Sequence, residues 1–333
     1  MKLSVIIPVY NGGETFRRCL KALWASSYAD WECIVVDDGS NDGSDKAAQS
    51  LGAVVIRSER PKSGPASARN LAVQQAQGEI LFFIDSDILV RPETLAHVAA
   101  VMADETISAC IGSYDDAPTA SNFLSQYRNL LHHYTHQHSN REAATFWSGC
   151  GAVRRDIFTA CGGFSTTFAR PSIEDIELGY RLRAKGHRII LEKELQVGHM
   201  KRWTAAAMLV TDIRDRAIPW ARLILAGGVI LDDLNLAMSQ RVSSAVAIIG
   251  AFSLLLALLF PWSLALTFFA ALVLVILNRP FYSFLREKRG FIFALLALPW
   301  HWLYFIYSGL SFGACYLWYS IPNPVRWIWR LTF

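Results

Sequence analysis

The pattern of hydrophobic and polar positions divides the chain near residue 240. Before that point, short apolar runs alternate with amphipathic segments, whereas from Val242 onward almost every residue is apolar or aromatic. The first part has the texture of a globular domain, and the second has stretches long enough to enter a bilayer.

In the first part, apolar runs without alternation predict buried strands, and segments with helical spacing lie between them. The predicted strands are residues 3–9, 31–38, 53–59 and 79–85, and the predicted helices are residues 13–27, 40–52 and 67–78. Unalternated strands separated by helices indicate an α/β fold, with a parallel sheet covered on both faces. In such a sheet ligands bind beyond the carboxyl ends of the strands.

Polar and acidic residues follow three of these strands. Pro8, Tyr10 and Asn11 come at the end of the first strand, Asp37 and Asp38 at the end of the second, and Asp85, Ser86 and Asp87 at the end of the fourth. The turn after the first strand lacks G-x-G-x-x-G, and the chain has no P-loop, so glycine amides do not cradle a phosphate here.

Asp85 and Asp87 lie two apart in FFIDSDILV, so an extended backbone projects both carboxylates to one side. Mg²⁺ and Mn²⁺ prefer carboxylate and phosphate oxygens, which makes the pair a candidate metal site. The alternative is a solvated loop, where D-x-D also occurs.

Four segments carry a family resemblance. SVIIPVYNGGETF, IVVDDGSNDGS, GPASARNLAV and FFIDSD, in this order and spacing, resemble the family 2 glycosyltransferases, inverting enzymes of the GT-A fold, over roughly residues 3–203. The resemblance implies a nucleotide-sugar donor, with UDP as the default nucleotide, and a Mg²⁺ or Mn²⁺ cofactor. The donor-binding residues that it implies are Pro8, Tyr10, Asn11, Asp37, Asp38, Arg69, Asn70 and Asp85, and the metal ligands are Asp85 and Asp87.

Two later segments supply the acceptor side by the same resemblance. WSGCGAVRRDIFTACGGF (147–164) resembles the family's loop and helix beside the donor sugar and acceptor, where Gly149 and Gly151 permit close approach. EDIELGYRL predicts a helix with Ile176, Leu178 and Leu182 turned inward.

Glu174 and Asp175 begin that helix, where acidic residues also serve as structural caps. The resemblance instead places Glu174 on the acceptor side and makes Asp175 the general base. Such a base takes the proton of an acceptor hydroxyl that attacks the anomeric carbon, and a single displacement inverts its configuration.

The segment QVGHMKRWT follows a predicted strand, RIILEKELQV. The resemblance suggests His199 as a further metal ligand, against the alternative of a packed histidine. Lys201 and Arg202 are candidates to stabilise the departing diphosphate, and they count among the donor-binding residues. The Q-x-x-R-W signature of processive synthases lacks its glutamine, which argues against long-polymer synthesis. His132 and His136, one helical turn apart, suit a metal or, as we favour, an acceptor-facing or membrane-proximal helix.

Three apolar stretches, about 242–260, 263–277 and 291–319, predict the membrane region. Residues 278–290 carry an excess of Arg and Lys, and Arg241 precedes the first stretch, so both points are expected on the cytoplasmic side, with an out-and-back hairpin between them. The third stretch could span once or re-enter. Arg326 and Arg330 in the tail favour a cytoplasmic end and an even number of crossings.

The linker, the net charge, the cysteines and the N-terminus limit the domain organisation and the location that can be expected. The linker interleaves arginines with apolar residues, which is typical of helices in an anionic interface, although ordinary packing helices share this pattern. A net charge of +4 gives no reason to expect a nucleic-acid partner. The cysteines form no CxxC pair, and the N-terminal apolar run is shorter than a signal peptide needs. We therefore expect a cytoplasmic catalytic domain (1–203), an amphipathic linker (204–240) and a multi-pass region (241–333) in the inner, cytoplasmic membrane.

The predicted function is metal-dependent, inverting transfer of a sugar from a nucleotide sugar to a hydroxyl of a lipid or lipid-linked acceptor, for envelope glycolipid or polysaccharide synthesis. A polyprenyl-phosphate sugar synthase is the enzymatic alternative, because its ionised acceptor phosphate needs no base. A membrane scaffold that binds nucleotide sugars without turnover is the non-enzymatic one.

Overall fold

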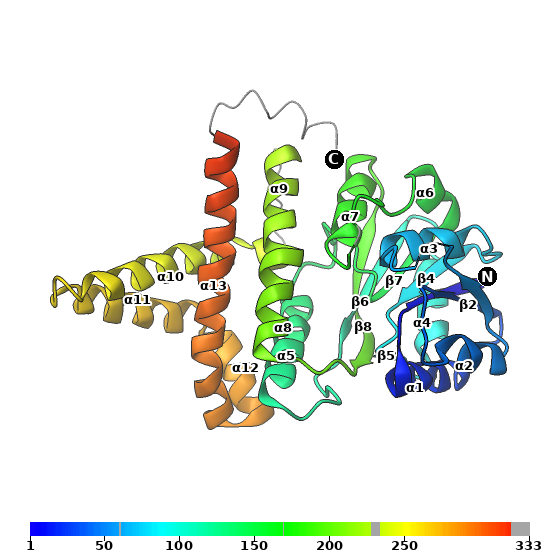
Figure 1. The fold of residues 1–333 in the computed structure, drawn as a ribbon, viewed down its shortest axis with the longest axis horizontal. Coiled ribbons are helices and arrows are strands. Elements are labelled where there is room, and N and C mark those ends of the chain that lie inside the picture. The colour runs from blue at the N-terminus through cyan, green and yellow to red at the C-terminus, as the bar shows by residue number, and fades with distance from the viewer. Residues whose placement is uncertain (60, 169, 228–233, 321–333) are drawn as a thin grey trace. The chain divides into compact units, whose positions relative to one another are not determined.

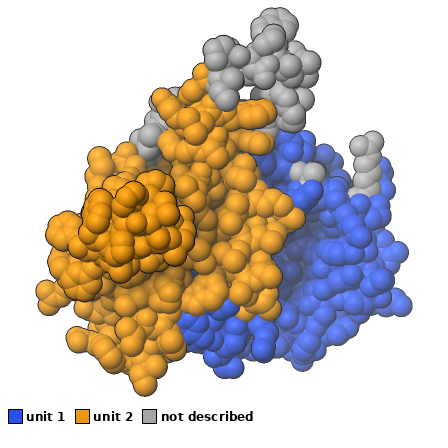
Figure 2. Space-filling view, turned by 60° about the vertical axis from the view of Figure 1, so that its left-hand side comes forward, with its two compact units in different colours: residues 1–202 blue, residues 203–333 orange. Residues whose placement is uncertain are grey.

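The computed structural model describes residues 1–59, 61–168, 170–227 and 234–320. The chain forms two compact units, residues 1–202 and 203–333, which Figure 2 shows in two colours. Part of the predicted linker (228–233) and the predicted tail with Arg326 and Arg330 lie outside the described residues.

The first unit is built on a mixed sheet (Figure 1). Its strands are β1 (Leu3–Val9), β2 (Trp31–Asp37), β3 (Val54–Arg57), β4 (Ile80–Ile84), β5 (Ile88–Leu89), β6 (Ala109–Tyr114), β7 (Cys150–Arg154) and β8 (Ile189–His199), in the order β3-β2-β1-β4-β7-β6-β8-β5. The four predicted strands are confirmed as β1 to β4, and they pair in parallel.

Beyond β4 the sheet is mixed and not parallel throughout as predicted: β7 pairs antiparallel with β4 and β6, and β5 with β8, whereas β6 and β8 pair in parallel. Residues 150–154, expected to be part of a loop, form β7, which pairs antiparallel with β4 so that Phe83 lies opposite Gly151. A Cβ at Gly151 would lie 2.3 Å from the carbonyl oxygen of Trp147, so glycine lets the strand fold back closely on the turn before it.

Helices cover both faces of this sheet, as predicted. They are α1 (Gly13–Trp24), α2 (Ser44–Ser50), α3 (Pro65–Val73), α4 (Thr94–Met102), α5 (Phe123–His138), α6 (Arg155–Ala160) and α7 (Glu174–Ala184). Alternate residues of β1 face opposite ways: Val5 and Ile7 pack with Phe16 of α1, and Ile6 packs in the other core, with Ala68 of α3. Both cores are built from apolar side chains, so the polar chemistry is left to the strand ends.

The second unit is helical. Its elements are α8 (Ala205–Val210), the π-helix η1 (Thr211–Ala217), α9 (Ile218–Gly227), the short η2 (Leu234–Leu236), α10 (Met238–Leu256), α11 (Ser263–Leu277), α12 (Arg279–Arg289) and α13 (Phe291–Ser320). By length and composition, α10 and α13 could each cross a membrane, and α11 with α12 would add a third span were the bent pair counted as one. Residues 291–320 form one continuous helix through Pro299, not a re-entrant pair.

Candidate active site

Loops after β1 and β2 are tied to each other at the carboxyl edge of the sheet. The N–H of Asn11 donates to Ser40 Oγ at 2.9 Å, and the N–H of Asn41 donates to Asn11 Oδ1 at 2.9 Å. Asn11 holds a positive φ of 50°, which asparagine tolerates better than most residues. The ring of Tyr10 is 47% exposed beside these loops, and Pro8 precedes it within β1. The structure thus gathers the residues predicted after β1 with those after β2.

Asp37 and Asp38 are both buried, and both accept hydrogen bonds from nearby backbone. Asp37 Oδ1 accepts from the N–H of Ser40 at 2.8 Å. Asp38 accepts from the N–H and Oγ of Ser63 and from the N–H of Gly64, at 3.0 to 3.1 Å. Asp38 therefore fixes the loop that leads into α3, which carries Arg69 and Asn70.

Arg69 connects two parts of the site that are far apart in sequence. Its guanidinium donates to Asp85 Oδ1 at 2.6 Å and to Glu174 Oε1 at 3.1 Å. Its side chain is only 3% exposed, and that of Glu174 is 5% exposed, so this ion pair is shielded from water. Burial raises the pKa of Glu174, and the neighbouring carboxylate of Asp175 raises it further. The bridge places the end of β4 directly beside the start of α7.

Asp87 faces His199 across the pairing of β5 with β8. Ile88 lies opposite His199 in this antiparallel ladder, and the N–H of Met200 donates to the backbone oxygen of Asp87 at 2.9 Å. The Asp87 Oδ2 to His199 Nε2 distance is 3.6 Å. Burial opposes ionisation of Asp87, but the hydrogen bond and charge of His199, with the charge of Lys201, leave its pKa lowered overall.

The predicted metal ligands are only partly assembled. Asp87 and His199 are neighbours, whereas Asp85 directs one oxygen to Arg69, and the described part of the chain has no group of three His, Cys, Asp or Glu side chains arranged to hold a metal. One carboxylate and one imidazole still fit a divalent ion whose remaining ligands are substrate phosphate oxygens and water, since Mg²⁺ is usually held by one or two carboxylates. Mn²⁺ tolerates the imidazole.

Asp175 is held by the segment that precedes β7. Its Oδ2 accepts from both the N–H and the Oγ of Ser148, at 3.0 and 3.1 Å, and its Oδ1 accepts from the N–H of Ile176 at 2.8 Å. Ser148 lies next to Gly149, one of the two predicted acceptor-side glycines. The acidic pair thus does more than cap α7: Glu174 reaches Arg69 and Asp175 reaches Ser148.

Other predicted residues lie at the margins of this group. Asn70 forms a reciprocal pair with the backbone of Phe164, its Nδ2 donating to the oxygen at 2.7 Å and its Oδ1 accepting from the N–H at 2.9 Å. Both hydrogen bonds fix the turn that follows α6 against α3. Lys201 and Arg202 are exposed just after β8, close in sequence to His199.

A cluster of Tyr114, His132 and Trp147 borders His199. The ring of Tyr114 stacks on His199 with centroids 4.1 Å apart, lies tilted against His132 at 4.3 Å, and meets Trp147 edge-on at 4.9 Å. His136 directs Nδ1 to the carbonyl oxygen of Gly112 at 2.9 Å. Sequence reasoning missed Tyr114 and Trp147, because nothing in their sequence context marks them as neighbours of His199.

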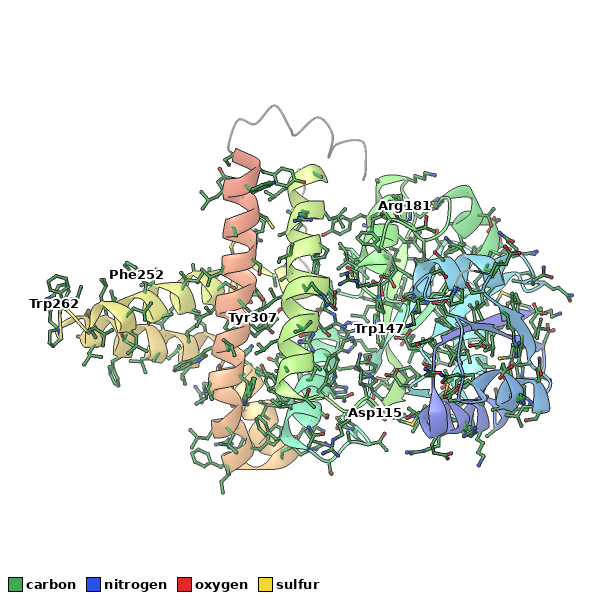
Figure 3. All side chains as sticks on the ribbon, viewed as in Figure 1. Asp115, Trp147, Arg181, Phe252, Trp262 and Tyr307 are labelled. Carbon is green, nitrogen blue, oxygen red and sulfur yellow. The ribbon has the colours of Figure 1, made fainter. Side chains whose placement is uncertain are left out.

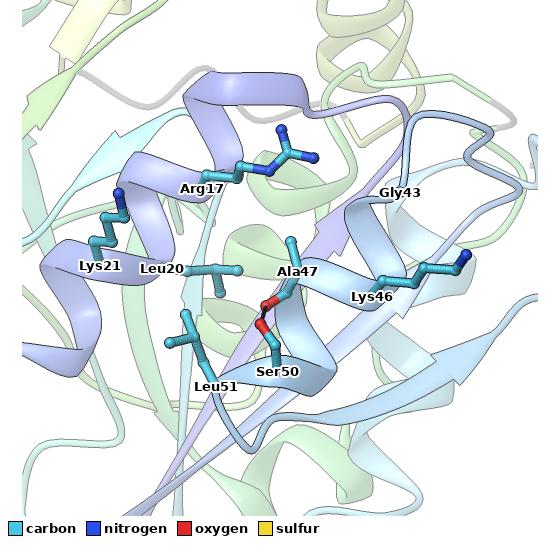
Figure 4. A pocket seen from close by; sticks show the side chains of 8 residues that line it. All are labelled: Arg17, Leu20, Lys21, Gly43, Lys46, Ala47, Ser50 and Leu51. Atoms are coloured by element: carbon cyan, nitrogen blue, oxygen red, sulfur yellow. Dashed lines mark hydrogen bonds between the residues drawn. The ribbon is translucent and has the colours of Figure 1, made fainter.

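A separate hollow of about 410 Å³ lies between α1 and α2. Figure 4 shows it lined by Arg17, Leu20, Lys21, Gly43, Lys46, Ala47, Ser50 and Leu51. None of the predicted site residues lines it.

The family model for glycosyl transferase family 2 matches residues 4–162, which include β1 to β7 and the predicted donor-side residues up to Asp87. Glu174, Asp175, His199, Lys201 and Arg202 lie beyond the matched segment.

Three curated relatives match shorter stretches. GlyG of Streptococcus pneumoniae is 28% identical over 34% of this chain and 38% of its own length, and AglE of Haloferax volcanii is 30% identical over 38% and 45%. Poly(ribitol-phosphate) beta-N-acetylglucosaminyltransferase TarS of Staphylococcus aureus is 37% identical over 30% of this chain and 18% of its own length. The chain therefore spans less than half of each of these relatives.

Two solved structures share the fold. The mannosyltransferase PcManGT from Pyrobaculum calidifontis, in complex with GDP-Man and Mn²⁺, has a TM-score of 0.59 at 20% identity, over 96% of this chain and 88% of that one. S. aureus TarS 1-349 in complex with UDP-GlcNAc has a TM-score of 0.54 at 19% identity, over 94% and 89%. With the mixed α/β, Rossmann-like sheet, these findings confirm the predicted GT-A fold, and residues 4–162 match the family model for glycosyl transferase family 2.

Proposed function

We propose that the protein transfers a sugar, with inversion, from a nucleoside-diphosphate sugar to a hydroxyl of a lipid or lipid-linked acceptor. The observation that carries the proposal is the Asp85–Arg69–Glu174 bridge, because it brings the acidic end of β4 next to Asp175. A site for the leaving diphosphate and a general base thereby share one edge of the sheet.

The side chains suit a single displacement. Asp175 accepts the proton of the acceptor hydroxyl while that oxygen bonds to the anomeric carbon; the bond from this carbon to the phosphate oxygen breaks, and its electron pair leaves with the diphosphate. Ser148 holds the Asp175 carboxylate, so the base is oriented before the acceptor arrives.

Asp87 and His199 are the residues that would hold Mg²⁺ or Mn²⁺. Such an ion supplies positive charge that stabilises the departing diphosphate. Lys201 and Arg202, exposed beyond β8, would add charge to the same leaving group. The loops carrying Tyr10, Asn11 and Asp37 would contact the nucleoside; UDP and GDP sugars are the donors to test first, since the structures of similar fold hold one or the other.

The membrane part of the proposal rests on the second unit. Its helices expose large apolar side chains, including Phe252, Leu258 and Trp262 at 61%, 85% and 74%. A monomeric soluble protein rarely exposes contiguous apolar surface of this kind. A lipid-held acceptor fits an enzyme that is itself held at a bilayer, here the inner membrane with the first unit in the cytoplasm.

The test compares Asp175→Asn with the full-length parent in detergent or vesicles, using panels of UDP and GDP sugars and lipid acceptors. We expect transfer to collapse with donor binding kept, and transfer by the parent to stop in chelator and resume with Mn²⁺. Asp30→Asn, at an exposed surface position, is the matched control.

Each alternative has its own outcome in this test. Survival of most transfer to a polyprenyl phosphate in Asp175→Asn would favour the polyprenyl-phosphate synthase, because an ionised acceptor needs no base. Donor binding without release of nucleoside diphosphate, with any acceptor, would favour the scaffold.

A further inference from the structure

The α10–α11 hairpin is built to sit in hydrocarbon. Residues 242–277 carry no charge, and Phe268 on α11 is exposed. Phe252 on α10 and Trp262 at the tip are exposed as well (Figure 3). Its polar atoms bond within the pair: Ser253 Oγ lies 2.8 Å from Thr267 Oγ1, and Ser263 Oγ donates to the oxygen of Ser253 at 2.9 Å. Internal satisfaction of polar groups is what a bilayer demands.

The hairpin and α13 run in different directions within the second unit. Figure 1 shows α10 and α11 projecting from one side of α13, transverse to it, while α9 runs along α13 on the other side. The crossing packs Ala247 of α10 and Leu274 of α11 against Phe305, near the middle of α13. The hairpin and α13 cannot both stand upright in the same bilayer.

Charged side chains beside α13 indicate which of the two, α13 or the hairpin, crosses the bilayer. Tyr307 OH donates to Asp212 Oδ2 of η1 at 2.5 Å, and Arg216 lies 4.0 Å from the same carboxylate. Arg214 pairs with Asp215 on the same turn, and the two arginine side chains are 55% and 47% exposed.

At 1.5 Å per residue, α13 is about 45 Å long and Tyr307 is about 24 Å from its first residue. An upright α13 would therefore carry four charged groups to about the middle of a hydrocarbon core roughly 30 Å thick, where exposed charges are costly. These groups are Asp212, Arg214, Asp215 and Arg216.

The bend between α11 and α12 also argues against an upright α13. The axis of α12 turns by 68° from that of α11, at the point where Arg279 ends the charge-free stretch. Tyr282 of α12 then packs on α13, its hydroxyl 3.1 Å from His301 Nδ1. The helix is amphipathic, with Phe281 and Leu285 buried and Arg286, Lys288 and Arg289 on its last turn, as in helices that lie in a membrane interface.

We propose that only the α10–α11 hairpin crosses the bilayer, and that α13 lies lengthwise in the interface, with the arginines of η1 and α9 toward anionic headgroups. The chain then crosses twice, so its two ends lie on the same side of the membrane. This goes beyond the proposed function and does not depend on it, because it concerns how the helices of the second unit meet lipid.

Reporter fusions to the full chain in a bacterial host test the crossings. Alkaline phosphatase is active only outside the cytoplasm, whereas green fluorescent protein fluoresces only inside it, because the protein exported in unfolded form does not become fluorescent. Each reporter is placed in turn at the N-terminus, at the hairpin tip beside Trp262, and after Phe333. We expect the two ends to behave alike and the tip to give the opposite result. Ends that differ, as three crossings require, or a tip that behaves like the ends, would overturn the proposal.

Depth measurements test the orientation of α13. Single cysteines at Leu296, Leu303, Leu310 and Leu317, all exposed on α13, and at Phe252 carry an environment-sensitive fluorophore in vesicles that contain anionic lipid. Lipids brominated at graded depths should quench the four α13 sites at one shallow depth, and Phe252 deeper. Greater depth at Leu303 and Leu310 than at the two outer sites would mean an upright helix and would refute the proposal. The parent, whose six cysteines are buried, gives the labelling background.

Discussion

Replacing Arg69 by methionine should destabilise the first unit strongly, because it strands a buried carboxylate. Methionine keeps the length and apolar volume of the stem but removes the donors to Asp85 and Glu174. The Asp85 side chain is 39% exposed and can recover water. Glu174, at 5%, cannot, and Asp175 beside it already disfavours its charge.

The expected loss follows from this burial. Removing one partner of a buried ion pair typically costs about 3 to 5 kcal/mol, which is a factor of about 10² to 10³ or more in the unfolding equilibrium. Arg188→Met is the matched control: Arg188 also pairs with a carboxylate, that of Glu142, but both of these side chains are exposed, at 39% and 47%. An exposed pair of this kind is worth about 0 to 1 kcal/mol.

The assay is urea unfolding of the full chain in detergent. Unfolding is monitored by hydrogen exchange at backbone amides of β1 and α7, which report on the first unit alone. A second substitution, Glu174→Gln, removes the stranded charge. The double variant should therefore lose less stability than the sum of the two single variants, by about 1 kcal/mol or more. Additivity within about 0.5 kcal/mol would refute the reasoning, because it would mean that the guanidinium and the carboxylate do not act on each other.

Three further predictions concern other parts of the first unit. A Cβ at Gly179 of α7 would lie 2.2 Å from the backbone nitrogen of Phe146, so Gly179→Ala should cost about 1 to 3 kcal/mol in unfolding free energy, whereas Gly227→Ala, with open space around it, should cost little. Burial lowers the pKa of His136 from 6.5 to about 4, so the unfolded chain binds a proton that the folded chain refuses. Unfolding free energy should fall by about 3 kcal/mol as pH drops through that window, and a series of unfolding curves should show a flatter acid limb in His136→Asn. Asp87→Asn should raise the Mn²⁺ concentration needed for half-maximal transfer by tenfold or more, while leaving the urea midpoint within the range of surface variants; an unchanged metal requirement would exclude Asp87 as a ligand.

Local sequence predicted the first half of the sheet well because those strands are long, apolar and buried on both faces. Predicted and observed bounds agree within two residues for β1 to β4. The same reasoning missed β7, since CGAVR is short and contains a glycine whose role is to admit the carbonyl of Trp147. Strand propensity cannot see such an approach, because it depends on what lies opposite.

The candidate site also has a part that the sequence predicted and a part that it could not. Sequence motifs selected Arg69, Asp85, Glu174 and Asp175 one by one, but the bond from Arg69 to Glu174 joins residues 105 positions apart. Asn70 was predicted to line the donor pocket, and the structure shows it holding the backbone of Phe164, 94 positions away. Motifs identify residue types at positions; the partner of each side chain is decided by how the chain folds back.

The membrane region shows why a hydropathy profile can identify a helix that is apolar enough to span a membrane without determining how that helix lies in it. Residues 291–319 are apolar enough to span, and nothing within that stretch argues against it. The decisive contact comes from Asp212, which is 95 positions earlier and bonds to Tyr307 in mid-helix. Because α8, η1 and α9 form one helical run, Asp212 cannot move toward hydrocarbon without taking Arg214 and Arg216 with it. The depth of α13 in the membrane therefore depends on the charged residues of η1 that pack beside it as much as on its own side chains. In this proposal, α13 lies at the same depth as α8, η1 and α9.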